Sequence, residues 1–463
     1  MRVIAEVDGV IFTADFPEAF MSHRKIDFSA AVSLVVANMV GTGVFTGLGF
    51  QLLSHEQAFT IMALWFIGGI MALLGAVCYA ELATRLPQDG GEYHFLSKVY
   101  HPALGFMAGF VSATVGFSAP IALAAASLGM YAHGVFETLH PVWVGTAVIA
   151  GIAAIHATNL SAGVKFQKIF TLVKVLLIAV FVLAGIINGN TQHVSFAFGD
   201  ASAAEIMTAG FAINLVYVSY AYSGWNASAY LAGEIQQPEK NLNRSIIWGT
   251  LLVMLLYVLL NAVFIASAPM PEMMVETQGA KAFQPKDVGI VSANYIFGTW
   301  GGKVMGGVIC LLLVSTISAM IIAGPRVIQP MFGKIPAFNS LSATNEKGNP
   351  VAAILFQTSL ALIILWTASF DSIMQYIGFT LTLFTTLTVA GVIVYRIKHG
   401  KPEGYKALGY PISPILFIAA NMGVCYFQFS EKTTESLIGL ATALVGVLLY
   451  FISTDKNNNS LNH

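Results

Sequence analysis

The sequence predicts an all-α integral membrane protein with about twelve transmembrane helices. Hydrophobic residues make up 56% of the 463 residues and charged residues only 10%, whereas a soluble domain carries about a quarter charged residues. Because so few charged residues cannot cover a water-facing surface, lipid must cover most of this chain. Two further observations support the class, namely the spacing of the apolar stretches and the distribution of lysine and arginine.

A helix needs about 20 apolar residues to cross a bilayer. The transmembrane domain is expected over 26–453, after a cytoplasmic N-terminal segment 1–25 that lacks a cleavable signal pattern. The polar segment 454–463 predicts a disordered cytoplasmic tail. Twelve spans are predicted, at 27–54, 58–85, 103–133, 141–157, 163–187, 205–234, 243–268, 301–327, 350–368, 371–397, 411–428 and 433–453.

Lysine and arginine gather on one side of the predicted membrane. The outer segments hold Lys281, Lys286, Lys303 and Lys432, Lys174 lies inside a span, and the other 17 of the 22 fall in the inner segments. The positive-inside rule then predicts a multi-pass protein of the cell inner (plasma) membrane with both termini in the cytoplasm, which also requires an even number of spans.

Two spans carry a break near their centre. Gly41-Thr42-Gly43 interrupts the first, and Ser223-Gly224-Trp225-Asn226 interrupts the sixth, about half a chain later. Interrupted helices at corresponding positions of two halves predict the substrate site of a transporter. We expect an inverted repeat, because each half would contain five spans. The predicted units are a first repeat 26–187, a second repeat 205–397 and extra helices 411–453.

The residue types at the breaks suggest two binding functions. After the first break, N–H groups at the start of a half-helix attract an anion such as a carboxylate; the alternative is a packing face of small residues. At the second break, carbonyls near Tyr222 and Ser223 would accept an ammonium, with Tyr220 and Trp225 closing over the solute. The alternative there is an interfacial aromatic belt.

Lys174 lies in the middle of the fifth span, where an ionisable residue is by default functional. Two roles remain open, a tether for carbonyls freed at the first break and a proton carrier. Ser315, Thr316 and Ser318 offer hydroxyls that would ligate sodium or accept from Lys174. For two of these three hydroxyls, a bond to the helix's own backbone is the simpler expectation.

No acidic residue and no arginine is placed at mid-depth of a span. A zwitterion with no net charge therefore fits better than a dication or an acid. We expect no cofactor and no metal, and Cys78, Cys310 and Cys425 read as core residues. An ion channel would need polar rings along a pore, and an intramembrane enzyme would need paired histidines or acids at depth; the spans favour neither.

Several segments together resemble the amino acid–polyamine–organocation (APC) superfamily over nearly the whole chain. The closest likeness is to bacterial amino-acid permeases akin to its L-type and cationic amino-acid transporter branches. The matching segments are Met39–Phe45, Tyr79–Leu82, Gly90–Tyr93, Tyr222–Asn226, Gly233–Glu234, Pro238–Leu242, Ala323–Val327 and Gly409–Pro411.

The resemblance implies a LeuT-type fold, with five-plus-five inverted repeats and two additional helices. It implies a sodium-independent amino-acid transporter, working as a proton symporter or an exchanger, with cationic amino acids or polyamines as the alternative substrates. No heavy-chain partner is implied. Carboxylate binding would fall to Thr42 and Gly43, and amine binding to the carbonyls of Met39, Tyr220 and Ser223. The expected substrate-binding residues are Met39, Gly41, Thr42, Gly43, Tyr220, Tyr222, Ser223, Gly224 and Asn226, the gates Tyr220 and Trp225, and the coupling residues Lys174, Ser315 and Thr316.

Overall fold

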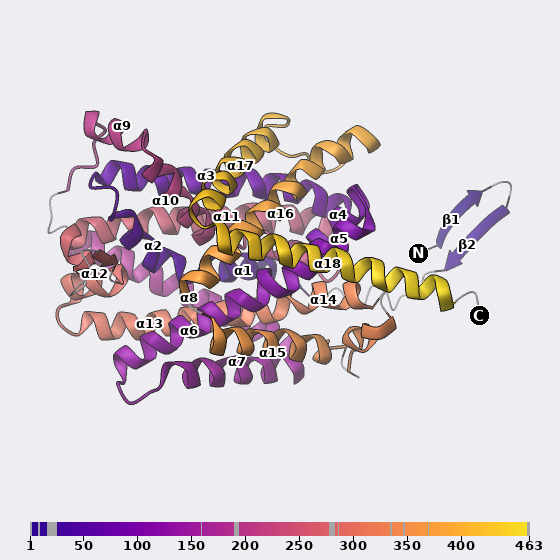
Figure 1. The fold of residues 1–463 in the computed structure, drawn as a ribbon, viewed down its shortest axis with the longest axis horizontal. Coiled ribbons are helices and arrows are strands. Elements are labelled where there is room, and N and C mark those ends of the chain that lie inside the picture. The colour runs from indigo at the N-terminus through magenta and orange to yellow at the C-terminus, as the bar shows by residue number, and fades with distance from the viewer. Residues whose placement is uncertain are drawn as a thin grey trace.

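The computed structural model describes residues 2–7, 10–15, 26–158, 160–188, 194–276, 283–285, 287–333, 336–345, 348–368 and 370–460. Lys281 and Lys286, used above to set the orientation, lie outside these residues. The described part is a long helical bundle (Figure 1). It is all-α apart from two antiparallel hairpins outside the predicted spans, β1 (Arg2–Val7) with β2 (Val10–Asp15) and β3 (Met274–Glu276) with β4 (Phe283–Pro285).

Each predicted span coincides with a helix or with a helix divided in two. In chain order these are α1 with α2 (Phe28–Met39, Gly43–Gln51), α3 (Ala58–Arg85), α5 with η2 and α6 (Pro102–Val111, Ser112–Ser118, Ala119–Val135), α7 (Pro141–Thr158), α8 (Leu160–Asn188), α10 with η3 (Ala209–Ala221, Ala227–Leu231), α11 (Pro238–Ser267), α13 with α14 (Gly301–Ala323, Pro325–Phe332), α15 (Val351–Thr367), α16 (Phe370–His399), α17 (Ile412–Glu431) and α18 (Thr433–Ser460). Short connecting elements are α4 (Glu92–Val99), α9 (Asp200–Ile206), η4 (Met270–Met273), α12 (Val288–Phe297) and η5 (Pro336–Ser342).

Length and apolar composition alone qualify nine helices of the described residues as membrane spans, or ten if α9 and α10 count as one. The other two predicted spans are shorter for visible reasons. The first is divided at residues 40–42, and α15 has only 17 residues. The interruption of the first span therefore leaves two helices that are each too short to qualify as a membrane span by length.

Two sequence expectations need correction. The predicted span 205–234 begins too early, because α9 and α10 meet at an angle of 71° around Met207. The tail predicted to be disordered continues as helix α18 to Ser460. Adding residues to an existing helix avoids the nucleation cost, so a polar segment can extend a long helix where it would not form one alone.

The start of α1 is held at the same end of the bundle as α4 and α14. Ile26 donates its N–H to the Glu234 carbonyl at 3.1 Å and accepts from Gln236 N–H at 2.9 Å. Arg326, on α14, binds the Glu234 carboxylate at 2.9 Å. Figure 1 shows α4, α14 and the C-terminal end of α18 at this end, with α9 and α12 at the other.

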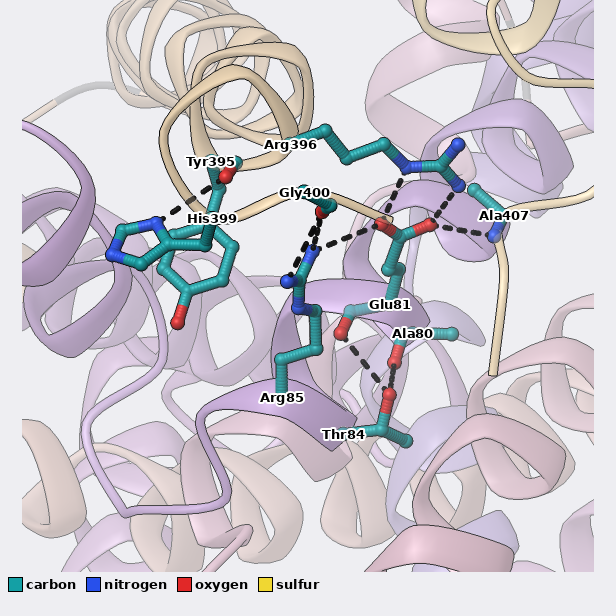
Figure 2. Close-up of polar contacts among 9 residues, drawn as sticks. All are labelled: Ala80, Glu81, Thr84, Arg85, Tyr395, Arg396, His399, Gly400 and Ala407. Carbon is teal, nitrogen blue, oxygen red and sulfur yellow. Dashed lines mark hydrogen bonds and ion pairs between the residues drawn. The ribbon is translucent and has the colours of Figure 1, made fainter. Parts of the chain in front are cut away.

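A buried ion pair fixes α16 to α3 near this same end. Glu81 accepts from Arg396 Nε at 2.7 Å and Nη2 at 2.5 Å, and its Oε2 also accepts from the Ala407 N–H at 2.7 Å. Figure 2 shows the Glu81 carboxylate between Arg396, Arg85 and Ala407. The side chain of Glu81 is 1% exposed, so its charge depends on these partners for stabilisation.

Replacing Arg396 with Gln should therefore destabilise the fold by about 3 kcal/mol, because it leaves the buried Glu81 charge with only Arg85, at 3.7 Å, and the Ala407 N–H as partners. Lys168→Gln is the control, since Lys168 and Asp27 form a pair whose side chains are 41% and 51% exposed and such pairs contribute about 0–1 kcal/mol. Thermal unfolding of the purified proteins in one detergent compares their Tm values. Equal, small shifts in both variants would contradict the assignment.

Candidate functional site

The two broken helices touch each other at their breaks. A Cβ added to Gly43 would lie 2.9 Å from both Cα and Cβ of Ala221, at the end of α10. One added to Gly224 would lie 2.9 Å from the backbone carbonyl group of Asn38. Gly224 also has a φ of 97°, which glycine adopts without strain. Glycines at both positions therefore allow the two chains to come into backbone contact.

Lys174 satisfies the carbonyls that the first break frees. Its Nζ donates to Val40 O at 2.7 Å, to Thr316 Oγ1 at 2.9 Å and to Ala37 O at 3.3 Å. The residue is fully buried. A cation at the C-terminal end of α1 also complements the negative end of the helix dipole.

Tyr257 satisfies carbonyls from both breaks at once. Its hydroxyl lies 2.7 Å from Met39 O and 3.2 Å from Ala221 O. Met39 O also accepts from the Gly41 N–H at 2.9 Å. The Met39 carbonyl, expected to bind an amine, thus has two partners within the protein. Tyr257 was missed in the sequence because a single tyrosine inside a long apolar helix reads as a core residue.

A cavity of about 120 Å³ lies at the contact between the breaks. Every residue predicted to bind substrate or to gate lines it, as does Thr316, while Lys174 and Ser315 lie outside its wall. The lining residues predicted from the sequence are Met39, Gly41, Thr42, Gly43, Tyr220, Tyr222, Ser223, Gly224, Trp225, Asn226 and Thr316. Pockets for drug-sized ligands span roughly 300–1,000 Å³, so this cavity suits a smaller solute.

The three hydroxyls of α13 have different partners. Thr316 Oγ1 accepts from Lys174, lies 2.7 Å from Val40 O and makes a local back-bond to Leu312 O at 3.2 Å. Ser315 instead accepts from Gln167 of α8 at 3.2 Å, and Ser318 pairs with His156 of α7 at 2.8 Å. The back-bond expected for two of the three is found only at Thr316, because side chains on neighbouring helices reach the other two hydroxyls.

The aromatic residues of the second break differ in their surroundings. Tyr220 lines the cavity and shares a hydrogen bond with Thr42 of the first break. Trp225 is buried between the rings of Tyr79, at 4.7 Å, and Phe417, at 6.2 Å. The Tyr222 hydroxyl donates to Trp65 O of α3 at 3.0 Å. Among these aromatic residues of the second break, Tyr220 is therefore the one that bonds to the first break.

Glu92 is a buried carboxylate on the cavity wall, and it comes from the segment between the predicted spans 58–85 and 103–133. Tyr79 and Asn226 donate to its Oε1 at 2.7 and 3.0 Å, and Ser112 and Tyr230 to its Oε2 at 3.1 and 2.5 Å. The sequence predicted no acidic residue at mid-depth among the spans, yet the structure brings this carboxylate to the cavity wall. A carboxylate at the start of the short helix α4 folds back against the second break, and only the tertiary arrangement reveals this.

Comparison with known proteins agrees with this geometry. The amino acid permease family matches residues 26–450. The chain is 26% identical to the serine/threonine exchanger SteT of Bacillus subtilis over 92% of its own length and 96% of the relative's. It is also 26% identical to the human large neutral amino acids transporter small subunit 2, over 93% and 80% of the two lengths. Identity to the human b(0,+)-type amino acid transporter 1 is 24%, over 94% and 89%.

A multi-pass helical bundle with two broken helices meeting at a small cavity defines a membrane transporter of the LeuT-type fold. The chain belongs to the amino acid permease family of the APC superfamily. It is accordingly an amino acid transporter rather than an enzyme.

The contact between the breaks can be tested by adding one methyl group. Gly43→Ala should weaken substrate binding roughly ten- to hundredfold, because the new Cβ would push against the Ala221 backbone and overpacking of this kind costs about 1–3 kcal/mol. Equilibrium binding of the labelled amino acid that the wild-type chain transports measures this. Gly307→Ala, on α13, is the control, since its Cβ would meet nothing within 4 Å and Gly307 lies outside the cavity wall. Equal affinities in the two variants would overturn the role given to the contact.

Proposed function

We propose that the chain transports a neutral, zwitterionic amino acid by alternating access without sodium. One observation carries this proposal, the backbone contact of Gly43 with Ala221. It places the N-terminal end of α2 beside the C-terminal end of α10 at the cavity wall. The first is the positive end of a helix dipole and the second is a negative end. An amino acid carries a carboxylate and an ammonium one carbon apart, so it complements such a pair.

The proposed contacts follow from these two ends. The substrate carboxylate binds the N–H groups at the start of α2, at Thr42 and Gly43, where the positive end of the helix dipole attracts an anion. Its ammonium binds carbonyls at the second break, at Tyr220 and Ser223. Met39, Gly41, Tyr222, Gly224 and Asn226 complete the wall. Tyr220 is the proposed gate in preference to Trp225, because Trp225 is fixed between two aromatic rings.

We propose that Lys174 acts as a tether and that the transport mode is exchange rather than proton symport. Three N–H donors of the ammonium match three acceptors, so the charged form is fully bonded. That fixed charge occupies the role a sodium ion would fill, with Thr316 as its side-chain partner. Ser315 does not bind Lys174 directly but accepts from Gln167, which lies on the same helix as Lys174. The relative from Bacillus subtilis is itself named an exchanger.

Location and assembly are also proposals. The excess of lysine and arginine on one side supports an inner (plasma) membrane protein with both termini cytoplasmic. The repeat boundaries 26–187 and 205–397, with extra helices at 411–453, follow from pairing the two breaks. The human large neutral amino acids transporter is named a small subunit, which indicates that that protein assembles with another chain. We propose no obligatory protein partner here, because no cysteine is placed to form a disulfide with a second chain. Cys78 and Cys425 are buried, and Cys310 lies within α13.

A cationic amino acid is the second candidate substrate, and Glu92 is the observation that favours it. A carboxylate on the cavity wall attracts positive charge. Against this, its oxygens already accept four hydrogen bonds, and a carboxylate has about four lone-pair sites. The neutral substrate therefore remains the better fit.

Uptake into proteoliposomes from a panel of labelled neutral and cationic amino acids tests the proposal. We expect neutral amino acids to be transported at least ten times faster than lysine or arginine, a difference of about 1.4 kcal/mol or more. Glu92→Gln should lower the rate while leaving that preference unchanged. Transport of lysine that disappears in Glu92→Gln would instead establish the cationic alternative.

Uptake with and without sodium, from pH 5 to pH 8, tests the role of Lys174. We expect equal rates in sodium and choline buffers. Lys174→Ala should reduce the rate at least tenfold, because each buried acceptor left unpaired costs about 1–3 kcal/mol. If Lys174 is a tether, exchange stays independent of an inward proton gradient. A gradient-driven increase that Lys174→Ala abolishes would show a proton carrier, and strict sodium dependence would contradict both roles.

Two controls belong to this experiment. Lys168→Ala removes a lysine from the same helix at an exposed position and should leave the rate nearly unchanged. Asp89→Asn removes another group that titrates in this range, since burial and the nearby Glu234 raise the pKa of Asp89 to about 7. Asp89 is neutral below that pH and charged above it. A pH effect that Asp89→Asn removes therefore belongs to the loop before α4 and not to Lys174.

A further inference from the structure

A groove of about 660 Å³ lies where α16 ends and the following loop leads to α17. Its lining includes Arg396, Lys401, Lys406, Leu408 and Tyr410 and contains no acidic residue. It lies at the end of the bundle that holds the Glu81 ion pair, away from the cavity at the breaks. Neither the family assignment nor the proposed transport mechanism uses this groove.

The wall of the groove is fixed by buried contacts. Glu81 binds Arg396 and also the Ala407 N–H at 2.7 Å. Figure 2 shows how this one carboxylate joins the end of α16 to the loop that carries Ala407. The Arg396 guanidinium lies 3.6 Å from the centre of the Tyr410 ring. These contacts fix the position of the groove, whereas the position of a groove on a mobile surface loop would not be fixed.

The groove combines positive charge with an apolar rim. Glu81 neutralises Arg396, but Lys401 and Lys406 form no ion pair within the described part of the chain. Two large apolar side chains also line the groove, Ile397 and Leu408, and Ile412 follows the lining residue Tyr410 at the start of α17; they are 78%, 77% and 63% exposed. Exposed apolar residues of this size are stable in contact with acyl chains.

We propose that this groove binds the head group of an anionic glycerophospholipid. The phosphate would lie between Lys401 and Lys406, and the acyl chains would lie along Ile397, Leu408 and Ile412. Basic pockets near the ends of transmembrane helices attract anionic head groups in this way. The apolar rim selects a lipid over a free phosphate, which would leave those side chains unused.

Native mass spectrometry of the delipidated chain, titrated with phosphatidylglycerol, tests this proposal. The double variant Lys401→Gln/Lys406→Gln should bind phosphatidylglycerol about thirtyfold more weakly, which corresponds to about 2 kcal/mol. The matched control is Lys165→Gln/Lys240→Gln, which removes two exposed lysines outside the groove and should bind as the wild type does. Leu408→Ser should weaken binding without changing the charge.

Three results would overturn the proposal. Equal weakening in the control pair would show general attraction between charges. Equal binding of phosphatidylcholine and phosphatidylglycerol by the wild type would show a site indifferent to head-group charge. Displacement of phosphatidylglycerol by millimolar inorganic phosphate, with Leu408→Ser behaving as wild type, would show a site for a free anion.

Discussion

Backbone groups without partners inside an apolar bundle are the constraint on which this structure depends. Breaking a helix at residues 40–42 and again at 222–226 exposes carbonyls and N–H groups where no lipid can satisfy them. Lys174, Thr316 and Tyr257 supply the missing donors, from three different helices. The breaks therefore determine which side chains the neighbouring helices must carry. In the proposed mechanism, the cavity is the part of this arrangement in which a solute, in place of the protein, completes the bonding.

Satisfying the breaks also restricts how they can move. Tyr257 bonds to Met39 of the first break and to Ala221 of the second, so the two broken helices share a donor. Glu92 connects the second break, through Asn226 and Tyr230, to α3 and to the π-helical turn η2. A shift of η3 must break or carry along these bonds. Alternating access in this chain is accordingly an exchange of one set of bonds at the breaks for another.

Local sequence was sufficient to predict the spans, both breaks and the residues of the breaks that line the cavity, because the length of an apolar stretch and a glycine within it are local signals. It was also sufficient to single out Lys174, since a charge at depth is conspicuous. The roles of Tyr257 and Glu92 could not be predicted from the sequence, for the opposite reason. Nothing around them in the sequence distinguishes a tyrosine in an apolar helix or a glutamate in a loop from ordinary residues. Their roles come from helix packing, which brings α11 and α4 against breaks far away in the chain.

The same reasoning explains why charge is placed so differently in two parts of the molecule. Lys174 is buried without a carboxylate and is stabilised by two carbonyls and a hydroxyl. Arg396 is paired with Glu81, which also accepts the Ala407 N–H. A helix end offers partial negative charge from its own carbonyls, so a lysine at a break needs no acid beside it. The ion pair of α3 and α16 lies where helices are intact, and there the compensating charge has to come from a side chain. A buried lysine without a carboxylate therefore marks an interrupted helix in its neighbourhood.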